Sequence, residues 1–395
     1  MRVAIVTNGL LPVPAVKGGG AETLIQNLLD QNEIYHEADF IVYSLYDKEA
    51  QLKSTDYRYT SFVFLPRKKW GIKDATFLLQ HFFKKKIMGF TVYRPIYDFK
   101  YVYEDVQGRN IDYIIVENTL VPFQRLVDLY GNKVFIHIHN ELFKQSYPIQ
   151  QRKLLGETVN KCAGVIVVSD YIKRYSLQMG YMEKAKFHIL MNAVDVSKFK
   201  QIIDKKPDSD NYSFVYFGRI CKEKGVVELV RSFSRIEDKK VRLFIIGEIK
   251  PDTDDSYSRD VLGLIRKDER INITGYIDHD VMWKVLGIMD CAVLPSRCQD
   301  SCPLTIIESM AAGLPIISTK TGGIPEEVDD KCAILLDNDS SLEQNLYKAM
   351  TYLSTNSDVS KKMSVASDAR TCVGGAFDLK SYYYRFIDIL RSKSK

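Results

Sequence analysis

The sequence lacks the features that mark several large classes of protein. No uninterrupted apolar run approaches the roughly 18 to 20 residues of a membrane span. There is no low-complexity tract and no repeat of solenoid period. Residues 1–7 read as a short strand without a signal-peptide cleavage site. We therefore expect a cytoplasmic globular protein, and its 395 residues favour two domains over one core.

Cysteine is sparse and unpaired in its spacing. The seven cysteines are scattered, and an odd count in a long chain favours reduced thiols over a disulfide framework. No Cys/His cluster has the spacing of metal ligands. We therefore predict neither a metal ion nor another bound cofactor.

The positive charge is unevenly spread. Residues 1–195 hold 25 Lys+Arg against 20 Asp+Glu, so the whole net charge of +5 lies there. In the segment 67–90, Asp74 is the only acidic residue among basic and large apolar ones: Arg67, Lys68, Lys69, Trp70, Lys73, Phe77, Leu78, Phe82, Phe83, Lys84, Lys85, Lys86, Ile87 and Phe90. This pattern is typical of a helix on an anionic membrane surface, here the inner face, or of a core helix with a solvated basic face. No nucleic-acid recognition motif accompanies it.

Short apolar runs alternate with helical patterns along the whole chain. The predicted strands are Val3–Thr7, Phe40–Tyr43, Phe62–Leu65, Tyr113–Val116, Val134–Ile138, Val165–Ser169, Phe214–Phe217, Leu243–Ile246, Ile271–Thr274, Cys291–Leu294, Ile316–Ser318 and Ala333–Leu336. Such alternation predicts an α/β chain with parallel sheets and right-handed crossovers. Two series in succession predict two doubly wound, Rossmann-like domains, with a ligand cleft between them by default.

Domain boundaries follow from composition. The polar stretch 204–211 reads as a linker, which gives domains at 1–200 and 205–375. A last helical pattern, within 376–395, is rich in tyrosine.

In the first domain, two strand ends carry candidate ligand groups. Gly18–Gly20 precede a predicted helix, and glycines there let backbone N–H groups approach an anion. The loop does not fit the G-x-G-x-x-G dinucleotide fingerprint, which argues against an NAD enzyme. His137 and His139 share one face by strand alternation, and His139, nearer the strand end, is the better candidate for the site. Glu117 ends the preceding strand in a similar place.

In the second domain, a turn after a strand carries Arg219 and Lys224. Two cations so close can converge on a diphosphate, although a plain surface turn would also carry them. Gly275, Tyr276 and Ile277 end a later strand, where backbone groups can hold a nucleobase.

The segment from Asp300 to Glu308 is the most informative part of the chain. It reads as a polar loop followed by a helix that begins near Pro303 and that Ser301 or Cys302 would cap. Glu308 falls on the helical stripe expected to be buried. A buried carboxylate needs a partner, which is either a cation of the protein or the hydroxyls of a ligand.

The order of these motifs is similar to that of a known family. A glycine-rich first loop, a strand-end histidine, Gly-Arg-x5-Gly containing Lys, Gly-Tyr, acidic-x7-Glu and Ala-x-Gly-x-Pro resemble the retaining GT-B glycosyltransferases of family four, the glycosyl transferases of group 1. The match runs from Gly18 to Pro325. The resemblance implies two facing Rossmann-like domains, with the helix in 376–395 packing back on the first, and a nucleotide-sugar donor in the second.

The resemblance also implies roles for single residues. Arg219 and Lys224 would hold the donor diphosphate, Glu308 would accept hydrogen bonds from the ribose, and Asp300 would lie near the reacting carbon. The other residues implied to border donor or acceptor are Gly19, Gly20, His139, Gly275, Tyr276, Ile277, Ser301, Cys302, Pro303 and Leu304. The chain departs from the family in having Asp300 where Glu is usual, and Ser301-Cys302 in place of phenylalanine-glycine.

We therefore expect a metal-independent retaining transferase that moves a sugar, most commonly from UDP, to a glycan or lipid-linked acceptor of surface polysaccharide synthesis. The site offers cations and a helix N-terminus to the leaving diphosphate. Two alternatives stay open. One is a catalytically silent partner of another glycosyltransferase, and the other is a sugar-nucleotide epimerase or hydrolase.

Overall fold

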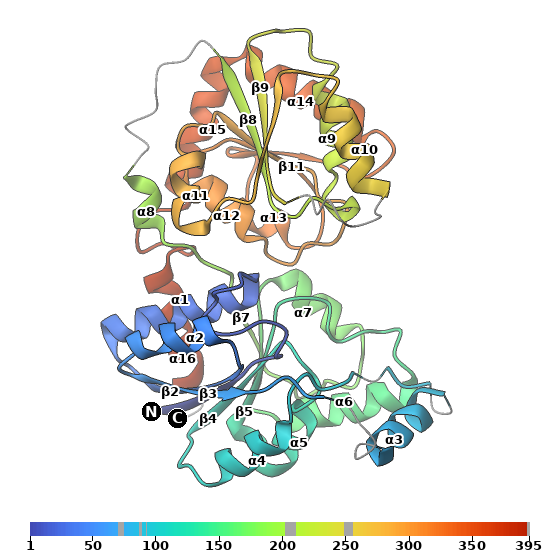
Figure 1. Cartoon of the computed structure of the whole chain (residues 1–395), viewed down its shortest axis with the longest axis vertical. Helices are drawn as coiled ribbons and strands as arrows, with labels where there is room; N and C mark the ends of the chain where they lie inside the picture. Colours follow the sequence, from blue (N-terminus) through green and yellow to red (C-terminus); the bar gives the residue numbers. More distant parts are fainter. Residues whose placement is uncertain (70–74, 87–88, 92, 202–210, 249–255, 393–395) are drawn as a thin grey trace. The chain divides into compact units, whose positions relative to one another are not determined.

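The chain divides into two units, each built on one sheet. The computed structural model describes residues 1–395 except 70–74, 87–88, 92, 202–210, 249–255 and 393–395. One unit is Met1–Met191 with Tyr382–Lys395, and the other is Asn192–Ser381. Both sheets are parallel and flanked by helices, which confirms the predicted α/β class (Figure 1). The stretch predicted as a linker, 204–211, lies almost wholly outside the described residues.

The sheet of the first unit has the order β3-β2-β1-β4-β5-β6-β7. Its strands are β1 (Arg2–Val6), β2 (Asp39–Leu45), β3 (Thr60–Leu65), β4 (Tyr113–Glu117), β5 (Val134–Ile138), β6 (Gly164–Val167) and β7 (Phe187–Ile189). The apolar runs predicted as strands form β1 to β6, and every residue of β5 is buried. The strand order reverses between β1 and β4, where doubly wound sheets bind ligands at the carboxyl ends of their strands.

Helices cover this sheet and connect its strands. They are α1 (Gly20–Tyr35), α2 (Lys48–Lys53), α3 (Ala75–Lys86), α4 (Phe99–Gln107), α5 (Phe123–Tyr130), α6 (Ile149–Lys161) and α7 (Asp170–Leu177). Several begin at side-chain caps that the sequence provides. Ser169, for example, accepts a hydrogen bond from the Ile172 N–H, which satisfies one free donor of the first turn of α7.

A helix from the far end of the chain, α16 (Leu379–Arg391), completes the first unit. Tyr383 is buried, and its hydroxyl donates to Asn32 Oδ1 at 2.7 Å and accepts from the Glu37 N–H at 2.9 Å. The ring of Tyr384 packs 5.3 Å from that of Tyr35. The tyrosine-rich pattern thus serves packing against α1.

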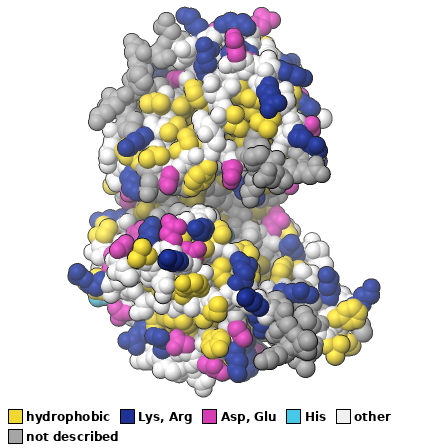
Figure 2. All heavy atoms as spheres, viewed as in Figure 1, with side chains coloured by type: hydrophobic (Ala, Val, Ile, Leu, Met, Phe, Trp, Pro, Cys, Tyr) yellow, Lys and Arg dark blue, Asp and Glu magenta, His cyan; other side chains and the backbone are white. Residues whose placement is uncertain are grey.

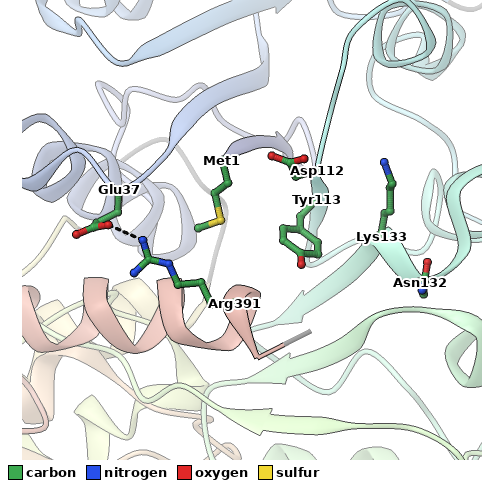
Figure 3. A pocket seen from close by; sticks show the side chains of 7 residues that line it. All are labelled: Met1, Glu37, Asp112, Tyr113, Asn132, Lys133 and Arg391. Carbon is green, nitrogen blue, oxygen red and sulfur yellow. Dashed lines mark hydrogen bonds and ion pairs between the residues drawn. The ribbon is translucent and has the colours of Figure 1, made fainter. Parts of the chain in front are cut away.

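A hollow of about 590 Å³ opens beside the end of α16, at the amino ends of β1 and β4 (Figure 3). Its charged side chains already have partners. Arg391 pairs with Glu37 at 2.5 Å, and the Asp112 carboxylate accepts from the backbone N–H of Arg2 at 2.8 Å. Since ligands of doubly wound sheets bind at the opposite, carboxyl edge, we do not assign this hollow to the site.

The sheet of the second unit has the order β10-β9-β8-β11-β12-β13. Its strands are β8 (Tyr212–Phe217), β9 (Val241–Ile246), β10 (Ile271–Gly275), β11 (Cys291–Leu294), β12 (Ile316–Thr319) and β13 (Ala333–Leu336). Its helices are α8 (Val196–Lys200), α9 (Val226–Phe233), α10 (Ser256–Ile265), α11 (His279–Leu286), α12 (Leu304–Ala311), α13 (Ile324–Glu327), α14 (Leu342–Thr355) and α15 (Ser357–Arg370). The reversal here lies between β8 and β11, next to the Asp300 to Glu308 segment.

Within the described part of the chain, no helix has both the length and the apolar character needed to cross a bilayer.

Candidate active site

The turn after β8 positions the two predicted cations of the second unit. The Tyr216 hydroxyl donates to the Arg219 carbonyl at 2.5 Å, which fixes the backbone while the Arg219 side chain stays exposed. Lys224 lies in a short 3-10 turn that ends at Gly225. Gly225 has a φ of +69°, and a Cβ there would lie 2.1 Å from the Pro295 carbonyl oxygen. Only glycine lets the turn approach the loop after β11 so closely.

Lys224 meets Asp300 across this contact. Lys224 Nζ lies 2.7 Å from both Asp300 carboxylate oxygens, and both side chains are about four-fifths buried. The two residues that the sequence predicted for diphosphate and sugar are therefore neighbours.

A glycine turn after β12 holds the Asp300 backbone. The Gly323 N–H donates to the Asp300 carbonyl at 2.7 Å, and the Gly322 N–H donates to Gln299 Oε1 at 2.6 Å. Gly322 has a φ of +56°, and a Cβ there would lie 2.0 Å from the Asp300 carbonyl oxygen. Gln299, which the sequence analysis did not single out, thus fastens the loop that carries Asp300.

Helix α12 carries Glu308 on a largely buried surface. Residues 306–311 are all buried, and Glu308 is 6% exposed, as its predicted place on a buried stripe requires. The helix begins at Leu304, near Pro303 as predicted, with Pro303 as its N-cap and no side-chain cap. The prediction that Ser301 or Cys302 caps it was wrong, because the Cys302 thiol turns inward and lies 3.4 Å from Glu327 Oε1. Burial raises the pKa of this thiol well above its ordinary value.

These elements surround one pocket of about 470 Å³ at the carboxyl ends of β8, β9 and β10. Its lining residues are Phe217, Gly218, Arg219, Ile220, Cys221, Ile246, Gly247, Glu248, Ser258, Tyr276, Ile277, Met282, Thr305 and Glu308. Arg219, Tyr276, Ile277 and Glu308 were predicted from sequence. A smaller hollow of about 40 Å³ shares Phe217, Gly218 and Thr305 with it and adds Lys224, Asp300 and Pro303. We call the two together the donor pocket, after the ligand that the sequence predicts for it.

The remaining predicted residues of this unit lie close to the donor pocket but do not line it. Gly275 has a φ of +77° and accepts a hydrogen bond from the Gly247 N–H at 3.0 Å. Ser301 and Leu304 are half-buried beside Pro303. Sequence reasoning missed Thr305 and Met282. Thr305 is one turn before Glu308 on α12, so its position was open to inference from helical spacing.

In the first unit, the glycine loop leads into α1 as predicted. Gly19, with a φ of +97°, is the N-cap residue, and Gly20 is the first residue of the helix. A Cβ on Gly19 would lie 2.3 Å from Glu22 Oε2, so this glycine leaves room for a buried carboxyl group.

At the carboxyl ends of β4 and β5, Glu117 contacts both predicted histidines. Glu117 Oε2 lies 3.0 Å from His139 Nε2 and 3.2 Å from His137 Nδ1. Glu117 and His137 are register partners in the sheet, which brings them together. Burial by itself raises the pKa of Glu117, but the two histidines bring that pKa down to about 2. Glu117 is therefore ionised at neutral pH.

The same three residues, which we call the His-Glu-His cluster, are the described group whose atoms could ligate a metal ion, since their ligand atoms lie within 4.8 Å of one another. The expectation of metal-independent chemistry therefore stays a prediction.

Comparison with known proteins finds similar glycosyltransferases. Residues 211–356, most of the second unit, match the family model "Glycosyl transferases group 1". The chain is 23% identical over 390 residues to a putative glycosyltransferase, YtcC, of Bacillus subtilis; the match covers 92% of this chain and 86% of that protein.

Two solved structures share the fold over nearly the whole chain. A glycosyltransferase of Rickettsia africae superposes with a TM-score of 0.78 at 17% identity, covering 100% of this chain and 99% of the other. Anabaena Alr3699/HepE in complex with UDP-glucose gives 0.69 at 16% identity, with 99% and 100% covered. Residues 211–356 therefore match the glycosyl transferases of group 1, the chain is similar to glycosyltransferases over nearly its whole length, and it has the GT-B fold.

Proposed function

We propose that the protein is a retaining glycosyltransferase that moves a sugar from a nucleoside-diphosphate sugar, with UDP as the nucleotide, to a glycan or lipid-linked acceptor of a surface polysaccharide. Arg219 and Lys224 neutralise the leaving diphosphate, so transfer needs no metal ion. The anomeric configuration is retained, as in the enzymes that the motif order resembles.

One observation carries this proposal. Glu308, Arg219 and the strand-end residues Tyr276 and Ile277 line the same pocket, and the Lys224–Asp300 pair adjoins it. A carboxylate accepts hydrogen bonds from ribose hydroxyls, and two cations bind a diphosphate. The donor pocket has both kinds of group at neighbouring positions. A buried carboxylate so placed favours the ligand-binding interpretation of Glu308 over a purely structural one.

Charge stabilisation is the chemistry that these residues supply. Lys224 exchanges Asp300 for a phosphate oxygen when the donor binds, and the exposed Arg219 guanidinium closes on the diphosphate as a fork. As the bond to the sugar breaks, negative charge grows on the phosphate, and fixed cations lower the energy of that state. Asp300, released from Lys224, is then available to the sugar.

The choice of UDP rests on the Anabaena relative, whose structure holds UDP-glucose. The apolar part of the donor pocket, with Ile246, Ile277 and Met282, gives a nucleobase a surface to lie against.

The test is calorimetric titration with UDP-, GDP-, ADP- and dTDP-sugars, followed by a hydrolysis assay. We expect saturable binding of UDP-sugars with slow sugar release. Glu308→Ala and Lys224→Ala should each weaken binding by about 10- to 100-fold, because each removes a charge-assisted hydrogen bond of roughly 1.5 to 3 kcal/mol. Lys222→Ala, an exposed lysine of the same 3-10 turn, is the matched control and should bind normally.

Absence of binding to every donor would contradict the transferase proposal and favour the silent-partner alternative. Full turnover to a new sugar nucleotide without any acceptor would favour an epimerase.

For the acceptor, we propose that the first unit docks on an anionic membrane through α3. Three apolar side chains at helical spacing are exposed there, Leu79 at 71%, Phe82 at 58% and Phe83 at 50%, and Lys84–Lys86 follow. Figure 2 displays hydrophobic side chains on the surface where α3 lies. An apolar face next to cations suits insertion among anionic head groups.

Parts of the segment 67–90 do not enter this proposal. Trp70, Lys73, Asp74 and Ile87 lie outside the described residues, as do the side chains of Phe77 and Leu78. Lys68 pairs with Asp98 at 3.7 Å, which lowers the net charge that this lysine offers a membrane.

Co-sedimentation with vesicles tests the docking. Wild type should bind phosphatidylglycerol-containing vesicles and not pure phosphatidylcholine, and Phe82→Ser with Phe83→Ser should abolish binding. Val365→Ser, which changes an equally exposed apolar side chain on α15, serves as control. Binding that is indifferent to anionic lipid, or unaffected by the double substitution, would rule the proposal out.

A further inference from the structure

The His-Glu-His cluster is a small network with defined geometry. Glu117 is the last residue of β4, His137 lies within β5, and His139 follows β5. The centroids of the two imidazole rings are 4.2 Å apart. The Glu117 and His137 side chains are each 3% exposed and that of His139 is 10% exposed. Asn118, in a left-handed conformation, accepts from the His139 N–H through its side chain at 3.2 Å. The backbone of His139 is thereby held as well as its ring.

The network determines where the imidazole protons lie. An ionised carboxylate only accepts hydrogen bonds, so the ring nitrogens that face Glu117 must carry hydrogen. These are Nε2 of His139, at 3.0 Å, and Nδ1 of His137, at 3.2 Å. In the neutral ring, the other nitrogen of His139, Nδ1, then keeps its lone pair.

That lone pair has no protein donor among the described residues. His139 Nδ1 and His137 Nε2 are both buried without a hydrogen-bond partner. A buried polar atom left unsatisfied costs roughly 1 to 3 kcal/mol. His139 Nδ1 is thus an unsatisfied acceptor at the carboxyl ends of the strands, where doubly wound sheets bind ligands. We infer from this that a bound ligand donates a hydrogen bond to it.

We propose that Glu117 is a positioning residue that holds His139 with Nδ1 unprotonated, so that His139 accepts a hydrogen bond from a hydroxyl of the bound sugar or acceptor. This inference rests on the proposed transferase function. It assigns Glu117 a part in the reaction that its position in the sequence only hinted at, with His137 as the second contact that keeps the carboxylate in place.

Charge around the ring supports the neutral state. Burial lowers the pKa of His139, His137 lowers it further, and Glu117 opposes both. Glu22 on α1 also faces this region, and burial, the largest effect, raises the pKa of Glu22, as does the nearby charge of Glu117. A protonated Nδ1 accepts no hydrogen bond, so activity should fall on the acid side as His139 becomes charged.

A metal ion is the competing occupant of the cluster. Separations of 3.0 to 3.2 Å between N and O atoms also suit ligands about 2.0 to 2.1 Å from a zinc ion. In that case the nitrogens that face Glu117 would be bare and would bind the ion.

Nitrogen-15 NMR of histidine-labelled, full-length protein separates these cases without an activity assay. The chain has six histidines, so His139 is assignable by comparison with His139→Gln. We expect wild-type His139 to show a protonated Nε2 and a bare Nδ1. Glu117→Gln should mix the two tautomers, because an amide can also donate. Asp39→Asn is the control, since it changes an exposed carboxylate 3.2 Å from His36 and should leave His139 unaltered.

The pH profile of sugar transfer or donor hydrolysis is the second test of the role of Glu117. Glu117→Gln should lower kcat by at least about tenfold and move the acid limb to lower pH, because it removes the charge that raises the His139 pKa. His137→Asn should move that limb to higher pH. A merely structural role predicts no such opposed shifts.

Three results would overturn the inference. They are a wild-type His139 protonated on Nδ1, an unchanged acid limb in both variants, and stoichiometric Zn²⁺ binding that shifts both histidine signals. The tautomer measurement needs no turnover. If the protein binds no nucleotide sugar, the proposed function fails on the titration while the tautomer is still measured.

Discussion

Lys224 Nζ lies 2.7 Å from each carboxylate oxygen of Asp300, at the edge of the donor pocket. The residue predicted to grip the donor phosphate and the residue predicted to face the sugar therefore neutralise each other in the structure. In the proposed function, donor binding has to compete with this ion pair, so that Asp300 influences phosphate binding without touching phosphate.

Replacing Asp300 should therefore separate nucleotide binding from chemistry. In Asp300→Ala, Lys224 is released, and UDP affinity should equal or exceed that of wild type while sugar transfer falls by about 100-fold or more. Titration with UDP beside a transfer assay checks both. If UDP affinity fell as far as in Lys224→Ala, the pair would be needed to orient the lysine rather than to restrain it.

The glycine turn that supports Asp300 should be intolerant of a side chain. Gly322→Ala adds a Cβ 2.0 Å from the Asp300 carbonyl oxygen, whereas Gly374, also at positive φ, has nothing within 4 Å. Both variants incur the strain of a left-handed residue, about 1 to 2 kcal/mol. Gly322→Ala should lower the free energy of unfolding by at least about 1 kcal/mol more than Gly374→Ala in urea titrations. Equal losses of unfolding free energy in the two variants would show that the loop carrying Asp300 moves to make room for the added Cβ at no energetic cost.

Glu327 should make stability depend on pH. It is fully buried, Oε2 has no hydrogen-bond partner among the described residues, and burial raises its pKa well above the ordinary 4.5. The folded protein holds this proton more tightly than the unfolded chain, so the contribution to stability is present below pH 4.5 and is lost as pH rises through the folded pKa.

Glu327→Gln should therefore stabilise the protein at pH 8, with Tm higher by about a few degrees, and have little effect near pH 4.5. Thermal unfolding across this range measures it. Glu326→Gln, on the same helix and half-buried, is the control. A Tm difference that is constant with pH would contradict the assignment.

The contact of α16 with α1 should depend on one hydroxyl. Tyr383→Phe removes the hydrogen bonds to Asn32 and Glu37 and should cost about 1 to 3 kcal/mol. Tyr384→Phe keeps the ring contact with Tyr35 and should be nearly neutral. Denaturant titration of both, followed by far-UV circular dichroism, makes the comparison. Similar losses would mean that packing rather than hydrogen bonding holds the helix.

Much of this architecture could be predicted from the sequence because buried parallel strands are nearly continuous apolar runs. The runs at Val134–Ile138 and Cys291–Leu294 became strands with the predicted bounds. The strand Phe187–Ile189 was missed. None of its residues is buried, since it lies at the edge of its sheet, and it therefore lacks the apolar signal.

The site was harder to predict where it depends on contacts between distant segments. Burial of Glu308 followed from helical spacing, but the bond from Gly322 to Gln299 joins residues 23 apart and leaves no local pattern. The partnership of Glu117 with His137 needed the strand order as well as the strands, because it arises from register between β4 and β5.

The return of α16 to the first unit has a consequence for how the protein is made. The second unit is one continuous stretch, Asn192–Ser381, whereas the first needs residues from both sides of it. On the ribosome the second unit can finish folding while the first still waits for its final helix. Until Tyr383 and Phe386 emerge, the surfaces of Tyr35 and Phe40 that they cover stay open to proteases and chaperones. Translation that stops short of α16 would thus leave a complete second unit attached to a first unit that lacks one of its helices.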